Sequence, residues 1–246
     1  EWLNMFHDML KYHLENTDPY DVVIVGDDAA LQFAMEYREE LFPEIPVVFE
    51  GVNDEEYAMK AAENPLVTGI IEKLSVEKNI DMALKVNPTA DKVVAILDDS
   101  VTADAERKNF YNSAENYPEL EFSEINAAEL ETARLQQAIS KVDDKTILIY
   151  IVMSKDGSGK QYTSDQAVRM VVNYSKVPVY RMVEAGIGDG LLGGNVVSMY
   201  KSGEIAAQMA MDIANGTDSA EINVVKDSPN IYCVDEDVMR KFGLEA

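Results

Sequence analysis

The chain is poor in the side chains on which most metal and redox chemistry depends. Its 246 residues include one cysteine, Cys233, and two histidines, His7 and His13. A single cysteine excludes an internal disulfide and any cysteine-cluster metal site. The histidines are six positions apart, whereas two ligands on one helical face are three or four apart. We therefore expect ordinary surface or packing histidines, no metal site and no cofactor.

Basic residues are also scarce. The sequence has 21 lysines and arginines against 45 aspartates and glutamates, which gives a formal net charge of −24. Such a charge repels phosphate backbones and anionic lipid headgroups. Nucleic acid is therefore excluded as an expected partner. The acidity does not itself identify a ligand, because surface carboxylates usually serve solubility.

Long apolar runs are missing as well. No stretch of eighteen or more apolar residues occurs, and the sequence opens at Glu1 without a methionine, a basic segment or an apolar leader. Any signal or anchor is expected to have been removed. Apolar residues nevertheless make up 47% of the chain and charged residues 27%, which is typical of a folded protein with a sizeable core.

Strand-length apolar runs alternate with segments of helical period from one end of the chain to the other. This alternation predicts an α/β fold with mostly parallel sheets. The strongest predicted strands are residues 21–26, 46–50, 92–97, 146–153 and 177–181, and the weaker ones are 120–125, 67–71, 195–199 and 222–225. Helical spacing places helices around residues 3–14, 30–41, 76–83, 135–142, 167–174 and 205–213.

A boundary between two lobes is predicted at residues 87–91 (NPTAD), where Pro88 ends a helix and a new alternation begins. We place it near residue 90. The first lobe then has few parallel strands, and the sequence opens within a helix. We therefore expect that at least one strand–helix pair has been lost ahead of Glu1.

Two loops resemble nucleotide-binding motifs but lack the necessary context. Residues 188–193 (GDGLLG) match the glycine fingerprint of dinucleotide-binding folds, yet a strand follows them instead of a helix. Residues 156–160 (DGSGK) resemble a phosphate loop, yet Gln161 stands where the magnesium-binding Ser or Thr belongs. We interpret both as loops of an α/β sheet.

No combination of side chains indicates catalysis. A G-x-S-x-G nucleophile elbow is absent, and neither histidine follows a predicted strand. The acid pairs Asp27–Asp28 and Asp98–Asp99 have the chemistry for acid–base work or for a divalent cation. Adjacent carboxylates on a turn more often cap the helix that follows. We therefore predict no catalytic residue.

Polar residues follow several predicted strands, and ligands of open α/β sheets bind outside the carboxyl ends of strands. There, helix N-termini suit a carboxylate and acidic side chains suit an ammonium group. The rival hypotheses are an NAD- or sugar-phosphate-dependent enzyme and a ligand-free interaction domain. The predicted ligand-binding residues are Asp27, Asp28, Glu50, Gly51, Asn53, Asp99, Ser100, Ser154 and Glu184.

Five segments resemble the type 1 periplasmic-binding-protein fold, in its branch of ABC-transporter substrate-binding-like domains. They are residues 21–33 (DVVIVGDDAALQF), 41–54 (LFPEIPVVFEGVND), 68–88 (TGIIEKLSVEKNIDMALKVNP), 193–216 and 230–244. The resemblance covers nearly the whole chain and implies two hinged lobes that the chain crosses between three times. Lobe one would be residues 1–90 and 196–220, and lobe two residues 91–195 and 221–246.

The resemblance also implies the function class, an extracytoplasmic protein that binds a small polar metabolite such as an amino acid. Its members are either sensor regions of membrane-bound histidine kinases and cyclases or substrate-binding proteins of importers. The run PVVFEGVND favours the sensor branch, because importers usually continue with Asp-Pro-Val where this chain has Asp54, Glu55 and Glu56. The full-length protein would then be membrane-tethered; the alternative is docking to a membrane permease.

Overall fold

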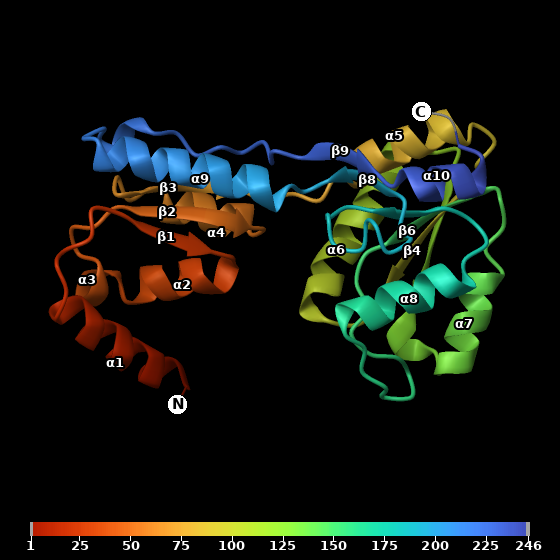
Figure 1. Ribbon diagram of the computed structural model, residues 1–246, viewed down its shortest axis with the longest axis horizontal. Coiled ribbons are helices and arrows are strands. Elements are labelled where there is room, and N and C mark those ends of the chain that lie inside the picture. Colours follow the sequence, from red (N-terminus) through yellow and green to blue (C-terminus); the bar gives the residue numbers. More distant parts are fainter. Residues whose placement is uncertain (1, 245–246) are drawn as a thin grey trace. The chain divides into compact units, whose positions relative to one another are not determined.

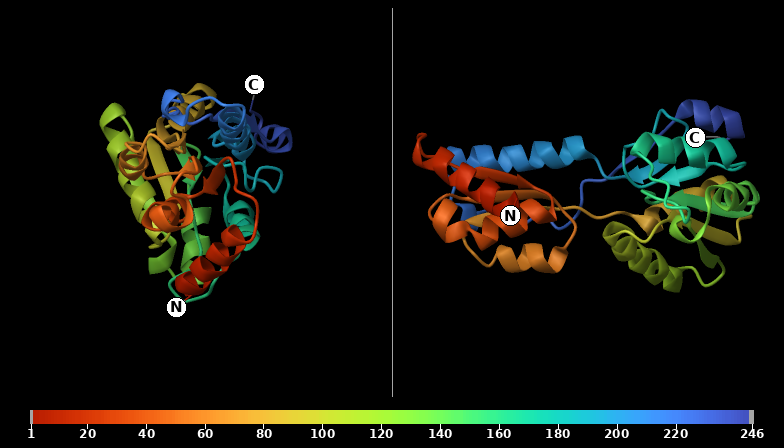
Figure 2. Two further views of the ribbon diagram at one scale, coloured as in Figure 1. Left: turned by 90° about the vertical axis from the view of Figure 1, so that its left-hand side faces the viewer. Right: turned by 90° about the horizontal axis from the view of Figure 1, so that it is seen from below.

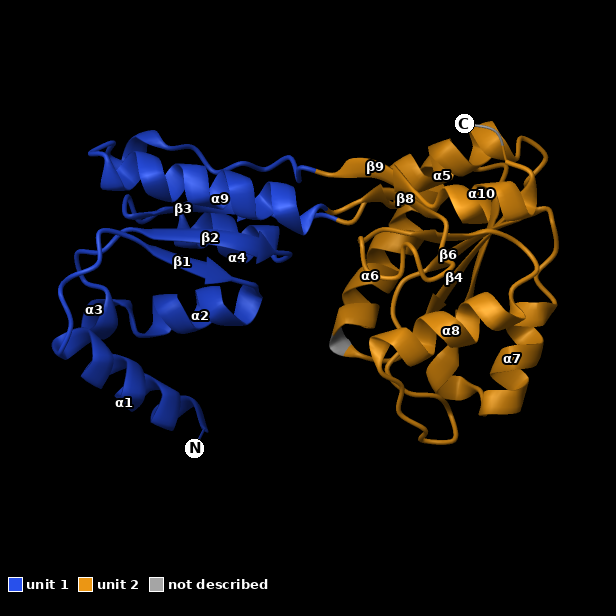
Figure 3. Cartoon of the chain, in the orientation of Figure 1, with its two compact units in different colours: residues 1–73, 198–229 blue, residues 74–197, 230–246 orange. Residues whose placement is uncertain are grey.

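The computed structural model describes residues 2–244, apart from the side chain of Val101. It divides into two compact units, coloured separately in Figure 3. Unit 1 comprises residues 1–73 and 198–229, and unit 2 comprises residues 74–197 and 230–246. The chain therefore passes between the units three times. The predicted α/β class is confirmed by parallel sheets in both units.

Unit 1 is built on a three-stranded parallel sheet in the order β1-β2-β3. Its strands are β1 (Val23–Gly26), β2 (Val47–Val52) and β3 (Val67–Ile71). Its helices are α1 (Trp2–Glu15), α2 (Asp28–Glu36), α3 (Arg38–Leu41), α4 (Glu55–Ala61) and α9 (Met199–Ala214). Figures 1 and 2 show α9 running along one face of this sheet.

The strands of unit 1 are almost continuously apolar because helices cover both faces of the sheet. Successive side chains of β2 point to opposite faces, as the period of two requires. Val47 and Phe49 join the core shared with α2 and α4. Val48 joins a second core, to which α9 contributes Ala206 and Met209.

Unit 2 is built on a six-stranded sheet in the order β5-β4-β6-β7-β8-β9, in which only β9 is antiparallel. Its strands are β4 (Lys92–Leu97), β5 (Glu121–Asn126), β6 (Thr146–Tyr150), β7 (Val179–Arg181), β8 (Gly193–Val196) and β9 (Ile231–Val234). Its α-helices are α5 (Val76–Val86), α6 (Val101–Ser113), α7 (Thr132–Ser140), α8 (Ser164–Tyr174) and α10 (Glu236–Phe242).

Unit 2 also has one core on each face of its sheet. Val93 and Ala95 of β4 pack on the face covered by α5, α6 and α10, whereas Ile96 packs on the face covered by α7 and α8. Short 3₁₀ turns occupy Ala114–Asn116 and Ala127–Glu129 in this unit, and Ser219–Glu221 in unit 1. No helix among the described residues is both long and apolar enough to span a membrane.

Three sequence-based boundaries differ from the structure. The first crossing lies at residues 73–74 instead of near residue 90, because Val76 and Ile80 of α5 pack into the core of unit 2. The other crossings lie at residues 197–198 and 229–230, so residues 221–229 belong to unit 1. The predicted strand 222–225 is wrong: only Val225 bridges β3, through Ile70.

The strand predicted at residues 195–199 begins earlier and ends earlier, as β8 at Gly193–Val196. As expected, the glycine loop at residues 188–193 re-enters the sheet, and no helix follows it directly. The Cα of Gly193 has no room for a side chain, because a Cβ there would lie 2.2 Å from the carbonyl oxygen of Cys233. This loop therefore serves close strand pairing in unit 2.

Candidate functional site

A small polar hollow of about 250 Å³ lies at the carboxyl ends of β1 and β2 in unit 1. Four of the residues predicted from the sequence line it: Asp27, Glu50, Gly51 and Asn53. The parallel register brings them together, since Gly26 pairs with Glu50 and the Asp27 amide donates to the Glu50 carbonyl (2.9 Å). These four residues, which were predicted from their positions at strand ends, therefore lie around one cavity.

Asp28 holds the loop after β2 in place. Its carboxylate accepts hydrogen bonds from the backbone amides of Asn53 (3.3 Å) and Asp54 (3.0 Å). The Asn53 side chain in turn donates to the carbonyl (3.3 Å) and the carboxylate (3.2 Å) of Glu72. Asp28 therefore fixes the loop after β2, while Asn53 and Glu72 line the hollow.

Glu72 and Met199 are lining residues that the sequence did not single out. Glu72 follows β3, and Met199 begins α9, more than a hundred residues later in the chain. Burial raises the pKa of Glu72, and the nearby carboxylates of Glu50, Asp27 and Asp28 raise it further, against a hydrogen bond from Asn53 that lowers it. The hollow therefore has strongly negative character and contains no basic side chain among its lining residues.

The backbone at Asp27 is held in an unfavourable conformation. Its φ of 79° is positive, and Asp27 is the only described residue other than glycine with that property. Its carboxylate accepts a hydrogen bond from the Asp28 amide (2.6 Å), so it caps α2 as the capping interpretation predicted. Such strained positions persist where surrounding structure over-determines them, and they concentrate at ligand-binding sites.

In unit 2, a buried carboxylate organises the ends of β4 and β6. Asp98 is fully buried, and it accepts hydrogen bonds from the Ser100 amide (3.0 Å), the Ser154 amide (2.7 Å) and the Ser154 hydroxyl (2.5 Å). Burial raises the pKa of Asp98, but the hydrogen bonds from Ser154 and Ser100 outweigh it, and the net direction is downward. Asp98 therefore brings the predicted residues Ser100 and Ser154 together.

Asp99 belongs to a charged network on the same sheet edge. Its carboxylate accepts from the Asn126 amide group (2.8 Å) and from Arg107 (3.4 Å). Arg107 also contacts Asp104 (2.5 Å) and Glu124 (3.1 Å). Ser100, and neither aspartate, accepts the Ala103 amide and so caps α6. The capping role predicted for this acid pair is thus taken by the residue after it.

The sequence missed Arg181, the last residue of β7. Its guanidinium donates to the carbonyls of Tyr150 (3.1 Å), Ile151 and Ala185 (3.2 Å), and it lies 4.7 Å from the centre of the Tyr150 ring. The predicted Glu184 lies three residues beyond β7, where its carbonyl accepts the Ile187 amide (3.2 Å). The carboxyl end of β7 in unit 2 therefore carries a basic side chain, which the acidic motifs of the sequence did not indicate.

The DGSGK loop is held by a buried carboxylate. Asp156 is 2% exposed, and it accepts hydrogen bonds from the amides of Ser158 (3.0 Å) and Lys160 (3.1 Å) and from the hydroxyls of Ser158 (2.5 Å), Tyr162 (2.7 Å) and Thr132. Burial raises the pKa of Asp156, but these bonds outweigh it and hold the pKa well below its usual range. The Asp156 carboxylate therefore holds the loop together, which agrees with the interpretation that DGSGK is not a phosphate-binding loop.

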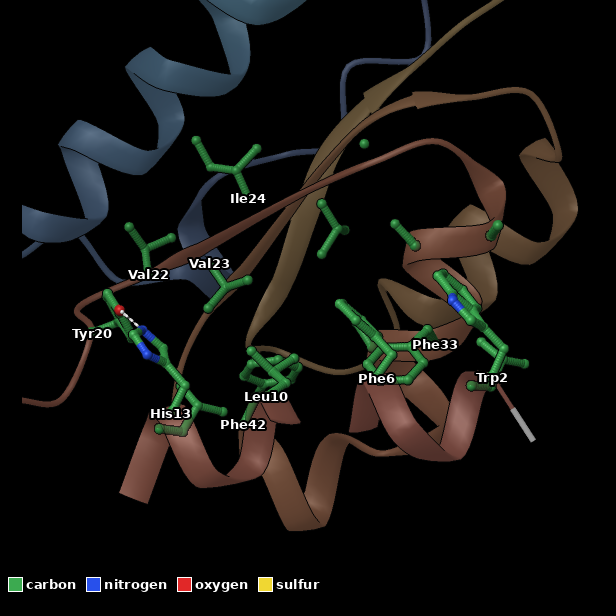
Figure 4. A pocket seen from close by; sticks show the side chains of 17 residues that line it. Trp2, Phe6, Leu10, His13, Tyr20, Val22, Val23, Ile24, Phe33 and Phe42 are labelled. Atoms are coloured by element: carbon green, nitrogen blue, oxygen red, sulfur yellow. Dashed lines mark hydrogen bonds between the residues drawn. The ribbon is translucent and has the colours of Figure 1, made fainter. Parts of the chain in front are cut away.

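A larger groove of about 680 Å³ lies between α1, β1 and α2 (Figure 4). Its lining is mostly apolar and includes Phe6 of α1, Val23 of β1 and Phe33 of α2. His13 and Tyr20 supply polar groups but bind each other (2.9 Å). A polar metabolite would find few partners here, so the polar strand ends fit such a ligand better.

Comparison with known proteins identifies the family. A family model described as ABC transporter substrate binding protein matches residues 14–245, and the chain belongs to this family. A curated tyrosine-binding protein from Clostridioides difficile is 23% identical over 207 residues, which are 82% of this chain and 58% of that protein. The chain therefore spans less than two thirds of that relative's length.

Solved structures show the same fold. A ligand-free, open substrate-binding protein with adhesive properties from Clostridium difficile aligns with a TM-score of 0.74 and 16% identity, over 99% of this chain and 80% of that one. An ABC domain from Streptococcus pneumonia in complex with L-Trp aligns with a TM-score of 0.63 and 17% identity, over 97% and 78%. The resemblance to the type 1 periplasmic-binding-protein fold, in its branch of ABC-transporter substrate-binding-like domains, is confirmed.

Proposed function

We propose that this chain is the solute-binding part of an ABC importer, that it works outside the cytoplasm, and that it captures an amino acid with an aromatic side chain. The family match over residues 14–245 carries the importer assignment. The sequence favoured a sensor of a signalling receptor, whereas the family that matches the chain is described as ABC transporter substrate binding protein. Docking to a membrane permease follows from the importer assignment.

The ligand class is supported by two relatives and by the charge of the unit 1 hollow. The curated relative is a tyrosine-binding protein, and one structural neighbour was solved with L-Trp. The hollow presents Asp27, Glu50 and Glu72 together, with the Asn53 amide beside them. Carboxylates in this arrangement form charge-assisted hydrogen bonds with an ammonium group. We assign the hollow to the amino group of the ligand.

Glu72 gives this assignment a measurable signature. Its pKa is raised by burial and by neighbouring carboxylates, so bringing a cation into the hollow would lower that pKa again. In the pH range in which Glu72 titrates, binding of an ammonium-bearing ligand should therefore release protons. Calorimetry in buffers of different ionisation enthalpy measures that release, and Glu72→Gln should abolish it without changing the fold.

The function is tested by thermal unfolding in the presence of amino acids, tyrosine and tryptophan among them. A ligand at a hundred times its dissociation constant adds about 2.7 kcal/mol to the free energy of unfolding. Asp27→Asn and Glu50→Gln should weaken the effect of the active amino acid. A library in which no amino acid stabilises the protein, while sugars or other uncharged solutes do, would overturn the proposed ligand class.

The importer and sensor assignments are separated by a functional assay. The protein, added with its active amino acid to a reconstituted ABC permease of the same organism, should stimulate ATP hydrolysis by the permease. Stimulation that needs both the protein and its ligand is the expected result. A permease that does not respond to the loaded protein would contradict the importer assignment and leave amino-acid binding intact.

A further inference from the structure

A pocket of about 300 Å³ lies in unit 2, at the opposite end of its strands from the predicted ligand-binding residues. Thr146 begins β6, and Val177 and Pro178 lead into β7, so the pocket lies at the amino ends of these parallel strands. Ser100 and Ser154, by contrast, follow β4 and β6 at their carboxyl ends. The pocket is therefore separate from the polar strand ends of unit 2.

Apolar side chains line this pocket from four segments of the unit. Helix α5 contributes Val86, strand β6 contributes Ile147, and the segment before β7 contributes Val177. Phe242 ends α10, and Leu244 follows it. The apolar body of a small molecule would be removed from water between these side chains.

Tyr180 supplies a hydroxyl that no protein group binds. The residue lines the pocket and is 4% exposed, and its hydroxyl forms no hydrogen bond with any residue that the structure describes. Burial raises the pKa of Tyr180 to about 12, so the hydroxyl stays neutral near neutral pH. Buried hydroxyls in proteins nearly always have a hydrogen-bond partner. The pocket is the side from which such a partner can reach Tyr180.

Other polar side chains of the lining already have partners within the protein. The Asn87 amide group donates to the carbonyl of Asp144 (2.7 Å), and the Thr89 hydroxyl donates to the Asn87 side-chain oxygen (2.9 Å). The Thr146 hydroxyl donates to the carboxylate of Asp143 (2.9 Å). Among the buried polar groups of the lining, the Tyr180 hydroxyl is therefore the donor left for a ligand.

The charges of the lining lie on its exposed side chains. Lys176 and Asp144 are both exposed and opposite in charge, so water solvates each of them. None of the buried lining residues within the described part of the chain carries a charge. A charged ligand group that entered the pocket would lose its hydration without meeting a buried counter-charge. The pocket therefore favours an uncharged ligand.

We propose that this pocket binds a small uncharged molecule with an apolar body and one hydroxyl or carbonyl group, which forms a hydrogen bond with the Tyr180 hydroxyl. A phenolic hydroxyl can both donate and accept, so either group is a suitable partner. The apolar body would lie against Ile147 and Phe242. A volume of about 300 Å³ is at the lower end of small-molecule pockets and suits a molecule with a single ring.

Cyclohexanol is a suitable probe, because it has one apolar ring, one hydroxyl and no charge. Titrated into isotope-labelled protein, it should shift the amide NMR signals of Ile147, Tyr180 and Phe242. Tyr180→Phe removes only the hydroxyl and should weaken binding about three- to tenfold, the loss of one neutral hydrogen bond. Cyclohexanecarboxylate and cyclohexylamine, which keep the ring but carry a charge, should bind more weakly than cyclohexanol.

Tyr232→Phe is the matched control, since it removes a hydroxyl from an exposed tyrosine on β9 of the same sheet. It should bind cyclohexanol like the wild type. Thermal unfolding and the NMR spectrum of each variant without cyclohexanol establish that it is folded.

Three results would overturn the proposal. Cyclohexanol could shift no signal of the pocket, or only signals around the apolar groove of unit 1. Tyr180→Phe could bind it as tightly as the wild type, or a charged analogue could bind as tightly as cyclohexanol. Cyclohexanol has neither the ammonium group nor the carboxylate of an amino acid, so these results leave the proposed capture of an amino acid untouched.

Discussion

Replacing Asp98 with asparagine is expected to destabilise unit 2 far more than its small chemical size suggests. The carboxylate is fully buried, and one of its oxygens accepts both the amide and the hydroxyl of Ser154, while the other accepts the Ser100 amide. An asparagine has only one oxygen, so its NH₂ group must face at least one of these N–H donors. Two donors then oppose each other in a buried site.

The magnitude follows from those three hydrogen bonds. A hydrogen bond to a charged group contributes about 1.5–3 kcal/mol, and a buried donor left without an acceptor costs about 1–3 kcal/mol. The Ser154 hydroxyl can rotate to accept from the new amide group, which recovers part of the loss. We therefore expect Asp98→Asn to lower the free energy of unfolding by about 2–4 kcal/mol near neutral pH.

The effect should depend on pH in a defined direction. Hydrogen bonds from Ser154 and Ser100 hold the pKa of Asp98 in the folded protein below its value in the unfolded chain, despite burial, which raises it. Its contribution to stability is therefore present above the unfolded pKa, about 3.9, and is lost as the pH falls through the folded pKa. The difference between wild type and Asp98→Asn should shrink in strong acid.

Urea denaturation followed by circular dichroism at a series of pH values measures this difference. Asp99→Asn is the neighbouring control: its side chain is 52% exposed, and its ion pair with Arg107 is long at 3.4 Å. A change within about 0.5 kcal/mol is expected there. Asp98→Asn as stable as the wild type, or a loss that is the same in acid as at neutral pH, would refute the reasoning.

Three other variants are expected to change stability. Asp156→Asn should lower the free energy of unfolding by about 3 kcal/mol and open the loop at residues 154–162 to proteases, because the buried carboxylate accepts five hydrogen bonds; a loop that stays resistant would contradict this. Gly69→Ala should destabilise by about 1–3 kcal/mol, because its Cβ would lie 2.2 Å from the Phe49 carbonyl oxygen. Gly203→Ala, in open space on α9, should instead stabilise by about 0.5–1 kcal/mol, and thermal unfolding distinguishes the two.

Local patterns were enough to predict most of the elements. Strand β4 was predicted with the bounds it has, residues 92–97, because its β-branched run is buried on both faces. The run at residues 222–225 shows where this fails: a short apolar run does not reveal whether a neighbouring strand offers it a full ladder of hydrogen bonds. Val225 finds a single bridge to Ile70 and no more.

The candidate site was predictable only in part. Asp27, Glu50, Gly51 and Asn53 were found because they lie at or just after the carboxyl ends of strands, and the structure gathers them around one hollow. Glu72 was missed although it also follows a strand, because neither its burial nor the carboxylates around it are visible in its own segment.

The sequence by itself determined the class of fold, the absence of disulfide and cysteine-cluster chemistry, and the strand ends at which polar groups gather, since each of these depends on residues within one short segment. Tertiary structure alone decided what those groups face. Asp98 meets Ser154 across 56 positions of chain, and Arg181 meets the carbonyl of Tyr150 across 31. Whether an arginine meets an acidic side chain, as Arg107 does, or backbone carbonyls, as Arg181 does, depends on such distant partners.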